Sequence, residues 1–201
     1  MCIKPIYERN IKSFLILVSF AFCFHSSAIA IIPLYFISSK IKNLRIYLLL
    51  IPLMYLLYFA GIRLTTFLSM LPIPSIQQKI MAYKLIMENG EMSEINIFNI
   101  FFLLKIIMCF FLMWKSTNIS QQNKYFIILL KIYIIGLSSF IVFSDFPTLA
   151  FRISELYQIV EILLVPMIIY AFTEKRIASL IPILYASVLL GLILFYNKII
   201  T

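Results

Sequence analysis

The stretch YFIILLKIYIIGLSSFIVF, Tyr125–Phe143, carries a single charged side chain, Lys131, in an otherwise apolar run. A helix needs about 20 mostly apolar residues to cross the hydrocarbon core of a bilayer. Backbone groups in lipid must also find their hydrogen-bond partners within the segment, which favours a helix. The stretch therefore predicts a membrane-spanning helix, and the alternating pattern that a membrane β-barrel requires is absent.

Further apolar runs of similar length lie on both sides of this one. They are Phe14–Ser38, Ile46–Ile62, Ile97–Trp114, Leu156–Phe172 and Ile177–Tyr196. Of the 201 residues, 63% are hydrophobic and 12% are charged, whereas a soluble domain carries about 25% charged residues. We therefore expect an all-α, polytopic transmembrane helix bundle of about six spans, forming a single integral membrane domain over residues 1–201.

The first run also resembles a secretory signal peptide. Lys4, Arg9 and Lys12 precede it, and Ala28-Ile29-Ala30 resembles a cleavage site. The apolar run continues to Ile37, however, so cleavage would leave a short apolar stub at the new N-terminus. We expect an uncleaved span.

The longest connection between runs, Arg63–Asn96, contains a second kind of helix signal. Its apolar residues are spaced four, three and four apart, at Ile76, Ile80, Tyr83 and Met87. This spacing places them on one helical face, and Ser75 and Gly90 suit the two ends of such a helix. We predict an amphipathic helix over Ser75–Asn89 that lies on the membrane surface or covers a cavity.

The formal net charge is +9, and the basic residues gather at the ends of the apolar runs. Placing Ser39–Arg45, Lys115–Lys124 and Lys175–Arg176 in the cytoplasm satisfies the positive-inside rule. With six spans, the N-terminus then lies outside, as it would in the C-terminal part of a larger membrane protein. No soluble module with a basic face is present, which argues against nucleic-acid binding.

Charged side chains inside the predicted spans need partners, because a charge at the centre of a membrane helix costs about 2.5–3.5 kcal/mol. Lys131 can extend its long stem toward the boundary near Lys124. Lys105 lies closer to the middle of its run, and Glu161 is its candidate counter-ion.

Two polar clusters have both a structural and a functional interpretation. His25, followed by Ser26 and Ser27, either donates to a neighbouring helix or lines a substrate cavity. A second series of polar residues recurs every third position: Arg152, Glu155, Gln158 and Glu161. It either contains an ion pair at a helix start or descends into a wet cavity that is open on one side.

Four short segments carry a family resemblance. They are FHSSA (residues 24–28), PLYF (residues 33–36), AFRISELY (residues 150–157) and ILLVP (residues 162–166). In order and spacing they resemble the EpsG family of bacterial exopolysaccharide and O-antigen polymerases of the Wzy type. The resemblance covers most of the chain and corresponds to roughly the C-terminal half of a typical member.

The resemblance implies glycosyl transfer at the outer face of the bacterial cytoplasmic (inner) membrane. The expected substrates are oligosaccharide repeat units on undecaprenyl diphosphate, in O-antigen, capsule or exopolysaccharide synthesis. The implied partners are the lipid bilayer, and a flippase and a chain-length regulator of the same pathway. No cofactor or metal is expected, since neither GxGxxG nor a Walker loop is present.

Under this interpretation, the leaving diphosphate needs a fixed guanidinium, with Arg152 as the first candidate and Arg63 as the second. Glu155 or Asp145 could take the proton of the acceptor hydroxyl, and His25 could position or deprotonate that hydroxyl. The remaining candidate substrate-binding residues are Ser26, Gln158 and Glu161.

Other functions stay open at this point. A transporter or flippase would also have charged residues inside its spans, and Lys105, Lys131 and Glu161 could couple ions. An acyltransferase or protease built on His25 lacks a GxSxG-like elbow. An inactive remnant of a truncated gene is a further alternative.

Overall fold

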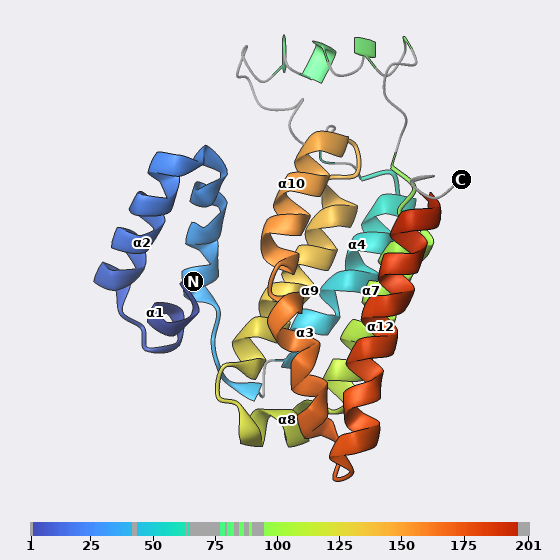
Figure 1. Ribbon diagram of the computed structural model, residues 1–201. Helices are drawn as coiled ribbons and strands as arrows, with labels where there is room; N and C mark the ends of the chain where they lie inside the picture. Colours follow the sequence, from blue (N-terminus) through green and yellow to red (C-terminus); the bar gives the residue numbers. More distant parts are fainter. Residues whose placement is uncertain are drawn as a thin grey trace.

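The computed structural model describes residues 2–41, 44–62, 64, 77–78, 80–82, 85–86, 89 and 95–196. All regular elements in these ranges are helices (Figure 1). The central one is α9, Phe126–Val142, which comes from the run that predicted a span and is buried almost all round. It packs against α4 (Leu50–Phe59), α7 (Ile100–Trp114) and α10 (Pro147–Gln158). An apolar helix thus forms the core of an all-α bundle.

The remaining helices of the bundle surround this core. Short α3 (Leu44–Leu48) leads into α4, and α8 (Ser116–Gln122) lies across one end of the bundle, bent by 71° from α7. After α10 the chain continues through α11 (Glu161–Leu164) and the 3-10 segment η3 (Pro166–Ala171) to the long helix α12 (Lys175–Tyr196). The sequence from Arg152 to Glu161 is therefore divided between two helices.

The first apolar run forms a helical hairpin instead of one continuous span. Helix α2 (Ile11–Phe24) and the 3-10 helix η1 (Ser26–Phe36) lie side by side, joined at His25 (Figure 1). The His25 backbone is extended, with φ −151° and ψ 120°. At 1.5 Å and 2.0 Å per residue the two arms are about 21 and 22 Å long, less than the hydrocarbon core of about 30 Å.

Local polar groups explain this break. The Nδ1 atom of His25 accepts a hydrogen bond from the backbone N–H of Ser27 at 3.2 Å, which caps the start of η1. Serine side chains also compete with the helical hydrogen-bond ladder. Pro33, inside η1, has no backbone N–H to donate.

Arg9 closes the open end of the hairpin. Its guanidinium donates to the carbonyl oxygens of Tyr35 at 2.6 Å and Ile37 at 2.8 Å, and the Tyr35 hydroxyl donates back to the Arg9 carbonyl at 2.8 Å. Arg9 has φ 56°, in the left-handed region that non-glycine residues rarely adopt. These three hydrogen bonds hold the turn between α1 (Ile3–Tyr7) and α2.

The hairpin changes the position of the N-terminus. The Tyr7 ring lies 5.2 Å from the Tyr125 ring, centroid to centroid, and the Lys124 ammonium lies over the Tyr7 ring. The N-terminal residues are therefore at the same end as the Lys115–Lys124 connection. A single first span would have placed them at the opposite end.

By length and composition, one described helix can cross a bilayer by itself: the Ala178–Phe195 part of α12, with a mean hydropathy of 2.3. The bent pair α7 and α8 would count as a second. Helices α2, η1 and α9, and the joined α3 and α4, are apolar but shorter. The number of spans thus stays a prediction. Large apolar side chains are exposed along the outer helices, among them Ile16, Phe20, Leu184 and Phe195.

Part of the predicted amphipathic helix lies outside the described residues, including Ser75, Ile76, Tyr83 and Met87. Within this segment, residues 77–78, 80–82 and 85–86 are helical. Ile80 is buried and Gln78 is exposed, as the predicted face requires, whereas Leu85 is exposed.

Candidate functional site

One hydrogen bond joins the two segments that carry most of the candidate residues. The Tyr157 hydroxyl of α10 donates to the Ala30 carbonyl of η1 at 2.5 Å. Both helices run in the same direction, starting from the end of the molecule where the hairpin has its tip and α10 begins (Figure 1). His25 lies five residues before Ala30, about 10 Å along η1, and Arg152 lies five residues before Tyr157, about 7.5 Å along α10. The two residues therefore lie at similar levels toward the same end.

Arg152 and Glu155 are both exposed on α10. Pro147, in the first turn of this helix, suits a helix start because it has no N–H to satisfy. Within the described part of the chain, neither Arg152 nor Glu155 forms an ion pair or a side-chain hydrogen bond. The alternative in which they pair at the helix start is thus not what the structure shows, and the Arg152 guanidinium is available to an anionic ligand.

His25 is exposed at the tip of the hairpin, next to exposed Ser26, and is not buried against a neighbouring helix. Its Nδ1 accepts from the Ser27 N–H, and the Ser27 hydroxyl lies 2.5 Å from the same nitrogen. A neutral imidazole whose Nδ1 is an acceptor carries its proton on Nε2. This arrangement makes His25 a hydrogen-bond donor toward a ligand, which favours positioning over deprotonation.

Asp145 lies in the connection between α9 and α10, and it is half-buried. It borders a cavity of about 310 Å³. The cavity is lined by Met54, Leu57, Tyr58, Ile62, Leu64, Ile141, Val142, Ser144 and Asp145. Its walls are mostly apolar, and its polar lining residues are Tyr58 in α4 and Ser144 and Asp145, just before α10 begins at Pro147. Asp145 therefore lies close to the N-terminal half of α10, which contains Arg152. The second arginine candidate, Arg63, lies outside the described residues.

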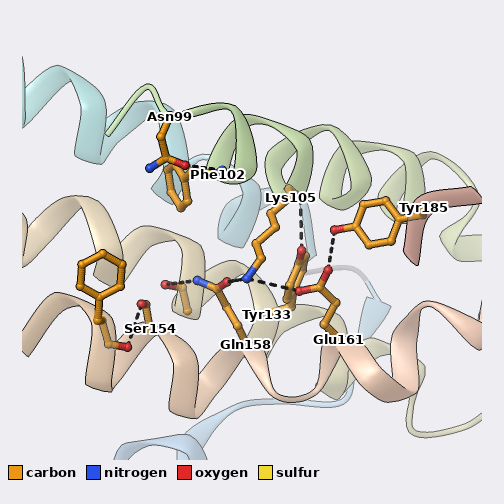
Figure 2. Close-up of polar contacts among 10 residues, drawn as sticks. Asn99, Phe102, Lys105, Tyr133, Ser154, Gln158, Glu161 and Tyr185 are labelled. Carbon is orange, nitrogen blue, oxygen red and sulfur yellow. Dashed lines mark hydrogen bonds and ion pairs between the residues drawn. The ribbon is translucent and has the colours of Figure 1, made fainter. Parts of the chain in front are cut away.

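A polar network inside the bundle engages the last two members of the polar series (Figure 2). Lys105 Nζ donates to Gln158 Oε1 at 2.7 Å and lies 3.7 Å from Glu161 Oε2. The Tyr185 hydroxyl donates to the other Glu161 oxygen, and the Tyr133 hydroxyl donates to the Lys105 carbonyl at 3.4 Å. The predicted pairing of Lys105 with Glu161 is confirmed. Because protein groups occupy Gln158 and Glu161, their geometry favours a role in positioning α10 over direct substrate binding.

Close packing of α9 on α10 supports the same region. A Cβ atom added at Gly136 would lie 3.0 Å from both Gln158 Cγ and Tyr157 Cβ. Gln158 Nε2 also donates to the Gly136 carbonyl at 3.4 Å. Sequence reasoning singled out neither Gly136 nor Tyr157. The only signal for Gly136 was a lone glycine inside a helical pattern, which points to a packing role.

Lys131 is fully buried and stabilises the opposite end of the bundle. Its ammonium donates to the carbonyl oxygens of Ser38 at 2.7 Å and Lys40 at 2.8 Å, and it lies over the Tyr47 ring. The long stem does reach toward the boundary, but it ends on backbone carbonyls instead of in water. Lys131 thus holds the connection that follows the hairpin.

Among the described residues, no group of three His, Cys, Asp or Glu side chains is arranged to hold a metal ion. Arg152, Glu155 and His25 together supply an exposed guanidinium, an exposed carboxylate and an imidazole donor, which suits binding of an anionic, hydroxyl-rich ligand.

No curated protein and no solved structure matched the chain. The EpsG family matches residues 1–201, the whole chain. The chain therefore belongs to the EpsG family, a group of Wzy-type polymerase-like proteins.

Proposed function

We propose that this protein is a multi-pass protein of the bacterial cytoplasmic membrane that joins oligosaccharide repeat units carried on undecaprenyl diphosphate. Its product would be O-antigen, capsule or exopolysaccharide. Membership of the EpsG family supports a role in polysaccharide polymerisation. The observation that carries the proposal is the hydrogen bond between Tyr157 and Ala30, since it brings the FHSSA tip and the Arg152 segment to one end of the molecule.

The reaction is a transfer at an anomeric carbon. The acceptor hydroxyl oxygen attacks that carbon, the bond to the diphosphate oxygen breaks, and undecaprenyl diphosphate leaves with the electron pair. Arg152 binds the leaving diphosphate, because a planar guanidinium matches phosphate oxygens in pairs. Glu155 or Asp145 takes the hydroxyl proton, and the Nε2–H of His25 orients a sugar hydroxyl or a phosphate oxygen.

Charge distribution supports the side on which this chemistry is placed. Among the residues that the structure describes, basic side chains gather at the end opposite to Arg152, where α8 and the start of α12 lie (Figure 1) and where Tyr7 of α1 contacts Lys124 and Tyr125. They include Lys4, Arg9, Lys40, Arg45, Lys115, Lys124 and Arg176. By the positive-inside rule this end faces the cytoplasm, so the end with His25, Asp145 and Arg152 faces outward, where lipid-linked repeat units are polymerised.

The test is deletion of the gene in a strain that makes the polymer, followed by analysis of lipid-linked intermediates. We expect loss of the polymer ladder and accumulation of single repeat units on undecaprenyl diphosphate at the outer face. The matched control is the same strain with the wild-type gene restored on a plasmid. Accumulation of repeat units at the inner face would instead assign a flippase, and an unchanged ladder would contradict the proposal.

A further inference from the structure

A groove lies at the basic end of the bundle, away from the proposed reaction site. Its volume is about 650 Å³, and it is formed by α3, the last turns of α7 and the first residues of α8. Its polar lining residues are Arg45, Ser116 and Thr117, and its apolar ones include Leu48, Phe110 and Trp114. No part of the proposed reaction uses this groove.

The lining combines two kinds of surface. Arg45, Ser116 and Thr117 supply a guanidinium and two hydroxyl groups, whereas Leu48, Phe110 and the neighbouring residues form an apolar wall. Arg45 is exposed, and it forms no ion pair with any described residue. The groove therefore offers a donor set for an anion beside an apolar channel.

The groove opens onto an apolar lateral surface. Trp114 is 74% exposed, and Phe110 and Ile107 are exposed on the same face of α7. On the α3 side, Ile46 and Leu49 are exposed as well. A free phosphate ion would need only the polar part of this site. Tryptophan at the boundary between apolar and basic surface is typical of a membrane interface.

We propose that this groove binds an anionic phospholipid of the cytoplasmic leaflet. The lipid phosphate pairs with Arg45, with Ser116 and Thr117 as further donors, and the acyl chains lie along Phe110 and Trp114. Charge complementarity at Arg45 and the apolar side opening together select this occupant. The inference rests on the proposed membrane placement but not on the polymerase reaction.

Trp114 makes this site directly observable, because the chain contains one tryptophan. The purified full-length chain is reconstituted in phosphatidylcholine vesicles, and its fluorescence is titrated with lipids that carry brominated acyl chains, which quench tryptophan on contact. Brominated phosphatidylglycerol should quench at an about fivefold lower mole fraction than brominated phosphatidylcholine, the preference expected of one basic residue at an anionic surface.

Variants test the assignment to Arg45. Arg45→Gln should abolish the preference for phosphatidylglycerol, and Arg45→Lys should retain most of it. Arg176→Gln, a change of an exposed arginine outside the groove, should leave it intact. Equal quenching of the wild-type protein by both lipids would overturn the proposal, and this result does not depend on whether any variant folds. A preference for phosphatidylglycerol that survives Arg45→Gln would overturn it as well. Polymer synthesis is not part of this readout, so failure here is distinct from failure of the proposed function.

Discussion

Tyr157 and Ala30 are 127 positions apart in the sequence, yet the Tyr157 hydroxyl donates to the Ala30 carbonyl across the contact between α10 and η1. This bond connects an otherwise peripheral hairpin to the helix that carries Arg152. In the proposed mechanism it fixes the height of the His25 tip relative to the guanidinium.

Tyr157→Phe removes this hydrogen bond and keeps the ring. We expect a loss of about 1 kcal/mol in stability, the usual contribution of such a bond, and a larger loss of polymer because the hairpin tip is no longer held. The measurement is the polymer ladder, normalised to the membrane level of the protein. Tyr170→Phe, on an exposed tyrosine of η3, is the matched control. A normal ladder from Tyr157→Phe would contradict the coupling.

Arg152→Lys keeps the positive charge but loses the planar, paired donors of the guanidinium. If Arg152 binds the leaving diphosphate, this variant should lose most polymerase activity at a normal membrane level. Arg176→Lys at the opposite end should have no effect. An exposed arginine without a catalytic role contributes only about 0–1 kcal/mol to stability, so its replacement by lysine would leave the polymer ladder unchanged. A normal ladder from Arg152→Lys would therefore exclude this residue as the diphosphate ligand.

The hairpin predicts a specific membrane topology. In a variant without the native cysteines, Glu8→Cys and Asn118→Cys should both react with an impermeant thiol reagent from the cytoplasmic side, because Tyr7 packs beside Tyr125. Leu149→Cys, in the exposed first turns of α10, should react from the outside. Inside-out vesicles and intact cells distinguish the two sides. Reaction of Glu8→Cys and Asn118→Cys from opposite sides would contradict the hairpin topology and support a single first span.

Gly136→Ala tests the close contact between α9 and α10. The new methyl group would lie 3.0 Å from Tyr157 Cβ and from Gln158 Cγ. Overpacking of this kind costs about 1–3 kcal/mol, so the midpoint of thermal unfolding in detergent should fall. At Gly191 nothing lies within 4 Å of an added Cβ, and Gly191→Ala in α12 should be neutral or slightly stabilising. Equal midpoints for the two variants would refute the close contact.

Much of the helical content followed from the sequence, because apolar periodicity acts locally. The run Tyr125–Phe143 became the buried core helix α9, and the charge of Lys105 required a partner that Glu161 supplies at 3.7 Å. The hairpin could not be predicted in the same way. FHSSA is compatible with a continuous helix as well as with a break, and the hairpin that follows the break is closed at its far end by hydrogen bonds from Arg9 to Tyr35 and Ile37, which lie 26 and 28 positions away.

The sequence by itself determined that the chain is helical and strongly apolar, and that its few internal charges need partners, since these properties depend on composition and local spacing. Only the tertiary structure decided which side chains meet. The hydroxyl of Tyr157 donates to the Ala30 carbonyl, Gly136 leaves room for α10 to pack closely on α9, and the N-terminal residues lie at the basic end. Each of these contacts joins residues remote in sequence, and their geometry is fixed by packing of whole helices, which no local pattern specifies.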